Sequence, residues 1–268
     1  MKGKLLAGLL STASVFVASR AFAVCLTSTT ISSPGYYELC SDYINQPIRI
    51  TANDVTLDCG GHKVWTTSNP TAPTEPCNGT GRHGIWVAND AWWIGNITVM
   101  NCNVAGWDSA IRAGYVSGLA LYGNVVHHSW DGFDLNQSIW INAADNWTYS
   151  NGAYCSNPPP PKQPGWNGDG VDLDLVDHST FTRIYSYSNK DHGVTVTYFH
   201  NYNPCGSYYN HNITYRDSHS FSNQGRGFNL KGLRNSTFVS NYCSSNAQGP
   251  LKNECDGGGN NINMPQCY

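Results

Sequence analysis

The feature that most constrains the fold is a phrase that repeats about every 22 residues. Four segments carry Ser-Asn followed shortly by Gly: "YSNGA", "YSNKDHG", "FSNQGRG" and "SSNAQG". Short alternating strands follow or overlap these glycines, as in "DGFDLN" (131–136), "DGVDLDL" (169–175), "HGVTVT" (192–197) and "RGFNLK" (226–231). "HGIWVA" (83–88) and "SAIRAG" (109–114) are looser copies. Very short strands at this period indicate the stacked turns of a solenoid.

Two of the intervals between copies are longer, and both contain a segment typical of loops. "YCSNPPPPKQPGWN" and "YFHNYNPCGSYYN" are rich in Pro, Asn and aromatic residues. We expect these loops, residues 152–167 and 198–210, to stand as walls beside the repeated strands. The recurrent asparagines suit a turn position at which stacked amides form a ladder, with Asn124, Asn151, Asn189, Asn223 and Asn246 as its members.

A second family of strands lies between these copies, including "NITVMNC", "SGLALYGN" and "HNITYRDS", and "IRITANDVTLDCGGHKV" (48–64) has the character of an opening turn. With these repeats the chain resembles right-handed parallel β-helix proteins of the pectin-lyase-like superfamily. The resemblance covers residues 31–246. It implies an all-β fold, a single-stranded right-handed parallel β-helix with capped ends and long inserted loops. Leucine-rich repeats have a similar length but need a Leu scaffold and a consensus Asn that this chain lacks.

The N-terminal segment predicts an exported protein. Residues 1–23 resemble a secretory signal peptide, with Lys2 and Lys4, the apolar run "LLAGLLSTASVFVAS", and "AFA" before the cleavage site. The alternative, a membrane anchor, is disfavoured because this run is short for a membrane span. We expect residues 24–268 to form one β-helix domain, with repeats over 31–246 and a C-terminal cap over 247–268, in a secreted or extracytoplasmic location without membrane insertion.

The cysteines predict disulfides, and the charge balance excludes one class of partner. All ten cysteines follow the predicted leader and show no metal-type spacing, which predicts disulfides in an exported chain, with Cys25–Cys40 as the first pair expected. Without the leader the chain has 12 basic and 18 acidic residues. This balance argues against nucleic acid as a partner. We expect a monomer.

Strand alternation predicts which side chains share a surface. The residue after each Gly is apolar and points inward, so the second residue after it points outward. That outward column contains Trp86, Arg112, Asp134, Asp172, Thr195 and Asn229. The next outward column contains Ala88, Gly114, Asn136, Asp174, Thr197 and Lys231. The turn position before Gly is occupied by His83, Ser109, Asp131, Asp169, His192 and Arg226. Stacking therefore predicts one exposed acidic patch with cations at its flanks, whose acids are Asp131, Asp134, Asp169, Asp172 and Asp174.

The acids of this patch have both a structural and a functional interpretation. A single Asp before Gly is ordinary turn chemistry, and outward acids often serve solubility. Asp134, Asp172 and Asp174, however, repel one another unless a cation, a shared proton or a function compensates. If the protein depends on Ca²⁺, these three are the candidate metal ligands. Alternatively, two carboxyl groups flanking a sugar bond act as acid and base in glycoside hydrolysis.

A narrower resemblance links the same segments to polygalacturonases. "WDGFDL", "NGDGVDL", "KDHGVTV" and "GFNLKG" resemble the four motifs of that family, Asn-Thr-Asp, Asp-Asp, Gly-His-Gly and Arg-Ile-Lys. Gly170 departs from the second motif and Asn229 from the fourth. The resemblance implies a catalytic set of Asp131, Asp169 and His192, to which we add Asp172 as a substitute for the missing acid. The candidate substrate-binding residues are Arg112, Asp134, Arg226, Asn229, Lys231, Trp130, Trp166 and Tyr198.

The sequence therefore predicts a secreted carbohydrate-active protein that hydrolyses a uronic-acid-containing, acidic polysaccharide without a cofactor. One alternative is a polysaccharide lyase or epimerase that uses Ca²⁺ and a basic residue to abstract a proton; its candidate bases are Arg112, His192, Arg226 and Lys231. Another is a non-enzymatic glycan-binding or cell-surface protein. Its sugar-stacking candidates, which are equally suited to packing, are Trp86, Trp107, Trp130, Trp166 and Tyr198.

Overall fold

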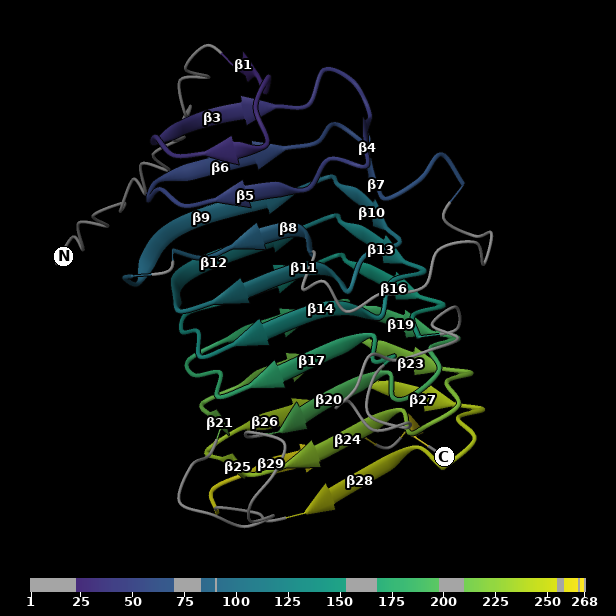
Figure 1. The fold of residues 1–268 in the computed structure, drawn as a ribbon. Coiled ribbons are helices and arrows are strands. Elements are labelled where there is room, and N and C mark those ends of the chain that lie inside the picture. The colour runs from purple at the N-terminus through teal and green to yellow at the C-terminus, as the bar shows by residue number, and fades with distance from the viewer. Residues whose placement is uncertain are drawn as a thin grey trace, which may run out of the picture.

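A computed structural model describes residues 23–69, 83–89, 91–152, 168–197, 210–254, 258–264 and 266–267. This part of the chain is a right-handed parallel β-helix without α-helices (Figure 1). Residues 1–22 of the predicted signal peptide, almost all of the two predicted wall loops, and the site candidates Trp166 and Tyr198 lie outside the described residues. Within the described residues no helix is long and apolar enough to cross a membrane.

Three long sheets, all with parallel pairing, form the faces of the β-helix. Sheet A contains β1 (Val24–Cys25), β3 (Gly35–Glu38), β6 (Val55–Asp58), β9 (Ile94–Met100), β12 (Val116–Tyr122), β15 (Asn142–Ala144), β18 (Thr180–Thr182), β22 (Thr214–Arg216), β26 (Thr237–Val239) and β29 (Asn261–Asn263). Sheet B contains β2 (Thr30–Ile31), β5 (Ile48–Ile50), β8 (His83–Val87), β11 (Ser109–Gly114), β14 (Asp131–Asn136), β17 (Val171–Asp174), β20 (Val194–Thr197), β24 (Phe228–Lys231) and β28 (Leu251–Glu254). Sheet C contains β4 (Tyr43–Ile44), β7 (Lys63–Trp65), β10 (Asn103–Ala105), β13 (Val125–His127), β16 (Trp147–Tyr149), β19 (Tyr185–Tyr187), β23 (His219–Phe221), β27 (Tyr242–Ser244) and β30 (Gln266–Cys267). A further short pair joins β21 (Asn210–His211) to β25 (Leu233–Arg234).

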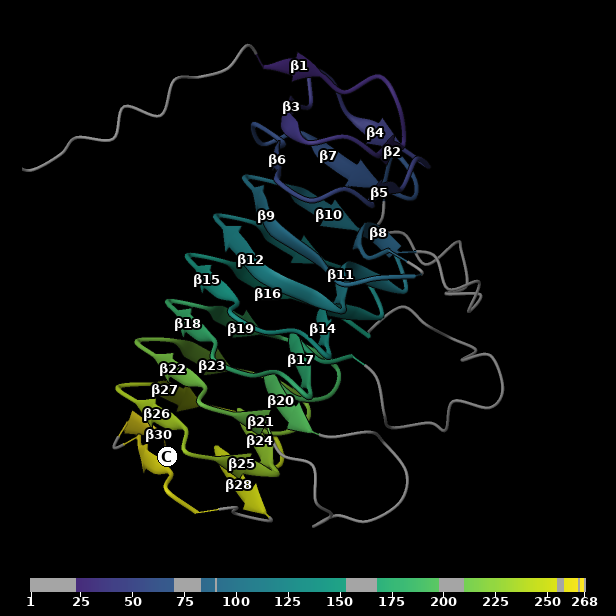
Figure 2. The ribbon, with the colours of Figure 1, turned by 90° about the vertical axis from the view of Figure 1, so that its left-hand side faces the viewer.

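Through most of the β-helix, each turn of the chain runs from sheet A to sheet C and then to sheet B, as β9, β10 and β11 illustrate. The strands of sheet B face the viewer in Figure 1 with their arrowheads toward the left. Figure 2 shows the same turns from the side, with sheets A, B and C as separate faces. The two predicted strand families therefore belong to sheets B and A, and consecutive copies lie on adjacent turns.

The core is a continuous column of apolar side chains inside the three sheets. Alternating positions such as Phe133 and Leu135 point inward and are almost fully buried. Aromatic rings stack inside sheet A, where Tyr215 lies 5.4 Å from Phe181 and 5.6 Å from Phe238 between ring centroids. Identical positions on successive turns therefore pack on one another, which explains why a 22-residue period dominates the sequence.

The predicted asparagine ladder exists, but it divides into two. Four members stack at the corner between sheets C and B through side-chain hydrogen bonds of 2.9–3.0 Å: Asn151, Asn189, Asn223 and Asn246. The prediction was wrong for Asn124, which lies at the corner between sheets A and C and donates to Asn146 at 3.0 Å. At both corners an asparagine side chain hydrogen-bonds to the neighbouring turn. Recurrent asparagines in the sequence therefore occur at two different corners of the β-helix.

The cysteines close both ends of the structure. The predicted Cys25–Cys40 disulfide is confirmed. All six cysteines within the described residues are bonded, in the pairs Cys25–Cys40, Cys59–Cys102 and Cys243–Cys267. The first and the last of these pairs tie down the terminal strands, whose edges are otherwise open to further strand pairing.

Candidate functional site

The acidic residues predicted to share a surface lie on the outer face of sheet B. Asp134 on β14 stands opposite Asp172 on β17, and Asn136 stands opposite Asp174. The intervening residues Phe133, Leu135, Val171 and Leu173 belong to the core. The predicted register of the outward column is confirmed, and it runs along the sheet as Trp86, Arg112, Asp134, Asp172, Thr195 and Asn229.

The prediction that the five acids of this patch are solvent exposed was wrong for four of them. At the corner that precedes sheet B, Asp131 is 8% exposed and Asp169 is 5% exposed. Asp172 is 9% exposed and Asp174 is 6% exposed, whereas the side chain of Asp134 keeps 18% of its surface accessible. A strand inside a parallel sheet has a neighbour on each side at about 4.8 Å. Short side chains such as those of Asp172 and Asp174 are therefore flanked by the outward residues of the turns before and after.

The carboxylates of the outer face have different partners. The Asp134 carboxylate pairs with Arg112, whose Nη1 lies 3.3 Å from Oδ2, and it accepts a hydrogen bond from Ser109 Oγ at 3.1 Å. Asp174 accepts a hydrogen bond from the hydroxyl of Thr197. Arg112 and Asp134, both predicted to contact substrate, are thus joined in an ion pair on neighbouring strands.

At the corner that precedes sheet B, each turn is hydrogen-bonded to the next by a side chain. Asp131 Oδ1 accepts from the backbone N–H groups of Gly168 (3.0 Å) and Asp169 (3.2 Å). Asp169 Oδ1 accepts from the N–H of His192 at 2.8 Å, and His192 Nδ1 accepts from the N–H of Arg226 at 2.9 Å. These contacts give Asp131, Asp169 and His192 a structural role, because each satisfies a backbone donor of the following turn.

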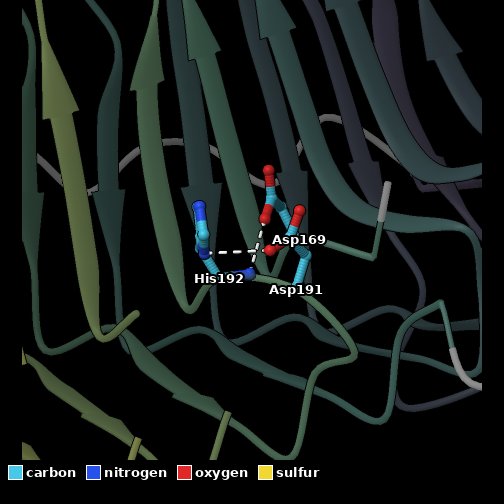
Figure 3. Close-up of side chains that lie close together, drawn as sticks. All are labelled: Asp169, Asp191 and His192. Carbon is cyan, nitrogen blue, oxygen red and sulfur yellow. Dashed lines mark hydrogen bonds and ion pairs between the residues drawn. The ribbon is translucent and has the colours of Figure 1, made fainter. Parts of the chain in front are cut away.

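The structure adds Asp191, which the sequence analysis missed, to this corner. Its Oδ1 lies 3.0 Å from His192 Nδ1, beside Asp169 (Figure 3). The signal for Asp191 was its place directly before His192 in "KDHG". Its backbone N–H donates to the carbonyl oxygen of Gly168 at 3.2 Å, so it occupies the position that a glycine fills one turn earlier.

Asp169, Asp191 and His192 have the residue types of a metal site, but the geometry fits a metal poorly. Each of the three residues offers one possible ligand atom, and these atoms lie within 4.8 Å of one another. Among the described residues, no other group of three or more His, Cys, Asp or Glu side chains meets this criterion. Nδ1 of His192, however, already accepts the Arg226 N–H. The backbone at Gly225 packs so closely that a Cβ there would collide with the same Nδ1. The trio predicted as Ca²⁺ ligands, Asp134, Asp172 and Asp174, is not gathered in this way among the described residues.

Two of the buried carboxyl groups have strongly perturbed acidity. Burial raises the pKa of Asp172 well above its usual range, and the neighbouring charges of Asp174 and Asp169 raise it further. Burial also raises the pKa of Asp169, together with the charges of Asp191 and Asp131. A carboxyl group that keeps its proton at higher pH is suited to act as a general acid.

The raised pKa of Asp172 predicts a specific dependence of stability on pH. The folded protein holds the Asp172 proton in a pH range in which the unfolded chain, with a pKa of about 3.9, has released it. This contribution to the free energy of unfolding is therefore complete below about pH 4 and is lost as the pH rises. We expect Asp172→Asn to melt at the parent temperature near pH 4 and above it at pH 8, as measured by thermal denaturation across this range.

Asp145 provides a control with the opposite sign. Its exposed carboxylate accepts hydrogen bonds from Arg183 Nε at 2.6 Å and from Arg183 Nη2 at 2.8 Å. These side-chain hydrogen bonds lower the pKa of Asp145. Any effect of Asp145→Asn should therefore be a loss of stability that appears as the pH rises. Equal pH profiles for the parent and Asp172→Asn would contradict the shifted acidity.

The remaining site candidates lie on sheet B or at the corner that precedes it. Asn229 is buried opposite Thr195, and Lys231 stands opposite Glu254 on β28. Trp130 is 5% exposed, which leaves little surface for the predicted contact with a sugar.

Two other tryptophans considered for sugar stacking also pack within the protein. Trp107 lies in the core and donates from Nε1 to the carbonyl oxygen of Val64 at 2.8 Å. Trp86 is covered by the guanidinium group of Arg49, 4.4 Å from the ring centroid. The structure thus favours packing for both side chains.

Comparison with known proteins supports the fold. The chain is similar to the Dettilon tailspike protein, with 12% identity and a TM-score of 0.61 over 82% of this chain and 42% of that chain. It is also similar to the pectate lyase Pel9A (16% identity, TM-score 0.48, 89% and 68% of the two chains) and to the periplasmic alginate epimerase AlgG (12%, 0.44, 87% and 69%). The chain spans less than half the length of the tailspike. No protein-family profile and no curated protein matches the sequence. The predicted resemblance to pectin-lyase-like proteins is confirmed for the fold.

Proposed function

We propose that the protein hydrolyses a uronic-acid-containing polysaccharide on the outer face of sheet B. The observation that carries this proposal is the pairing of Asp172 with Asp134 on adjacent strands. Burial raises the pKa of Asp172, so this group retains a proton to donate. Asp134 is partly exposed and ion-paired with Arg112, as a carboxylate that acts on the sugar should be. The two acids thus have the different environments that glycoside hydrolysis requires.

In the proposed reaction Asp172 protonates the glycosidic oxygen as the bond to the leaving sugar breaks. Adjacent parallel strands are about 4.8 Å apart, which is nearer to the roughly 5–5.5 Å between carboxyl groups in retaining enzymes than to the 6.5–9.5 Å in inverting ones. We therefore assign Asp134 as the nucleophile that forms a glycosyl ester. Asp172 then removes a proton from the water that hydrolyses the ester, which restores both groups. Asp131, Asp169 and His192 are assigned to holding the turns that carry these acids.

We also infer that the chain is exported, as one β-helix domain that works as a monomer without a cofactor. The three disulfides within the described residues support an oxidising compartment. The leader-like composition of residues 1–23 supports secretion. Arg112, Arg226 and Lys231 are cations beside the acidic face that are suited to uronate carboxylates.

A screen of polygalacturonate, alginate and related glycans tests this function. We expect new reducing ends without the ultraviolet absorbance of an unsaturated sugar, because hydrolysis creates no double bond. NMR of the first product should show retained anomeric configuration. Reducing ends accompanied by ultraviolet absorbance would mean elimination, and no product from any acidic glycan would reject the proposal.

A further inference from the structure

Exposed aromatic side chains gather where sheet B passes into sheet A. Of the large aromatic side chains that are exposed within the described residues, four lie at this edge: Trp92 (75% exposed), Trp93 (50%), Tyr115 (48%) and Trp140 (59%). Trp93 and Tyr115 stand at equivalent positions of consecutive turns, since the residues that follow them, Ile94 and Val116, are paired. We call Trp93, Tyr115 and Trp140 the aromatic corner.

Two rings of the aromatic corner stand at backbone positions that do not favour a bulky side chain. Tyr115 and Trp140 have left-handed φ angles of 58° and 56°. On other turns the position of Tyr115 is filled by Gln137 and Leu175, and that of Trp140 by Asn96, His178 and Asn212, all in the same conformation. Asparagine tolerates this conformation better than a bulky aromatic residue does. Since the rings are also exposed, burial does not compensate, and an exposed aromatic group at a strained position indicates contact with a partner.

The arrangement of the rings leaves their faces accessible. Trp93 and Tyr115 meet edge to face, with centroids 5.9 Å apart and planes at 81°. On sheet C, by contrast, Tyr149, Tyr187 and Phe221 stack face to face at 5.0 Å and cover one another. The aromatic corner therefore offers ring faces on which a flat apolar group can lie.

The aromatic corner continues the outer face that carries the acids. Tyr115 directly follows Gly114, which stands opposite Asn136, and Asn136 stands opposite Asp174. A Cβ added at Gly114 would meet no atom within 4 Å, so the surface between Arg112 and Tyr115 is open. A chain molecule bound at Asp134 and Asp172 can thus extend over Gly114 to the rings.

We propose that the aromatic corner is a sugar-binding subsite for residues of the polysaccharide remote from the cleaved bond, an inference that rests on the proposed function. The apolar C–H face of a pyranose ring packs on an aromatic face, while the sugar hydroxyls remain in water. Rigid aromatic rings supply this contact with little loss of side-chain entropy. A neutral surface here also lets an anionic glycan continue beyond the acidic residues without further repulsion.

Affinity electrophoresis in native gels that contain polygalacturonate or alginate tests the subsite. The test variant is Trp93→Ala combined with Tyr115→Asn, which installs the residue type preferred at a left-handed corner. Trp147→Ala is the control for the loss of an exposed tryptophan elsewhere, because Trp147 (41% exposed) lies on sheet C, where its ring stacks on Tyr185 with centroids 4.3 Å apart. We expect at least a tenfold weaker affinity for the double variant, with an unfolding temperature near that of the parent, and an unchanged affinity for Trp147→Ala. On a hydrolysed glycan, KM should rise with little change in kcat.

The outcomes separate this inference from the proposed function. Retention of parental affinity by the double variant would overturn the subsite, even if hydrolysis is observed. A change from an oligomer to a monomer in the double variant, measured by light scattering, would overturn it in favour of an interface between copies. Binding that depends on the aromatic corner, without hydrolysis by the parent, would support the subsite and reject the hydrolase. A parent that binds neither polymer and gives no product from any acidic glycan would overturn both.

Discussion

Asp172→Asn is expected to lower turnover on the best glycan by about 100- to 10,000-fold, because the amide cannot donate the proton that the leaving oxygen needs. This corresponds to about 3–5 kcal/mol in activation free energy. The substitution keeps the volume of the side chain, so the fold should be unaffected. Since burial raises the pKa of Asp172, the parent should lose activity as the pH rises and this proton dissociates.

The shape of the pH profile distinguishes a catalytic acid from a structural one. We expect the residual activity of Asp172→Asn to lack the alkaline decline of the parent, measured as kcat against pH. Asp145→Asn is the control, because it removes an exposed carboxylate in the bend directly after β15 and should leave turnover unchanged. Full activity in Asp172→Asn would reject the proposed acid and leave the acidic face as a structural feature.

Asn189→Ala is expected to lower the free energy of unfolding by about 2–5 kcal/mol. Asn189 is fully buried. Its Oδ1 accepts two hydrogen bonds from Asn151, one from the backbone N–H at 3.1 Å and one from the side-chain Nδ2 at 3.0 Å. Its own Nδ2 donates to Asn223 and Ser186, both at 3.0 Å. Alanine leaves these groups buried without their partner, and each such group costs about 1–3 kcal/mol.

Urea unfolding followed by circular dichroism measures this loss. Asn142→Ala provides the control, because Asn142 is exposed on β15 and a surface substitution usually changes stability by less than about 0.5 kcal/mol. Both variants replace an asparagine by alanine in the same protein, and they differ in whether the lost amide is buried in the ladder. If Asn189→Ala were as stable as Asn142→Ala, the amide ladder would contribute nothing to folding.

The sequence was sufficient for the architecture because every turn of a β-helix meets the same environment. A period near 22 residues and a two-residue alternation placed Phe133 in the core and Asp134 opposite Asp172. The Cys25–Cys40 pair was also predictable, since it closes a short terminal segment. These features depend on local spacing, which a stack of similar turns converts directly into neighbours in space.

Burial and the contacts at corners were decided only by the tertiary structure. Alternation gave the outward direction of Asp172 but not its 9% exposure, which depends on what flanks it on both sides. The approach of Asp191 to His192 and the division of the asparagines between two corners depend on backbone conformation between strands. A periodic sequence specifies which residues stack, whereas desolvation and hydrogen bonding depend on all atoms around them, and these alone set the acidity on which the proposed chemistry rests.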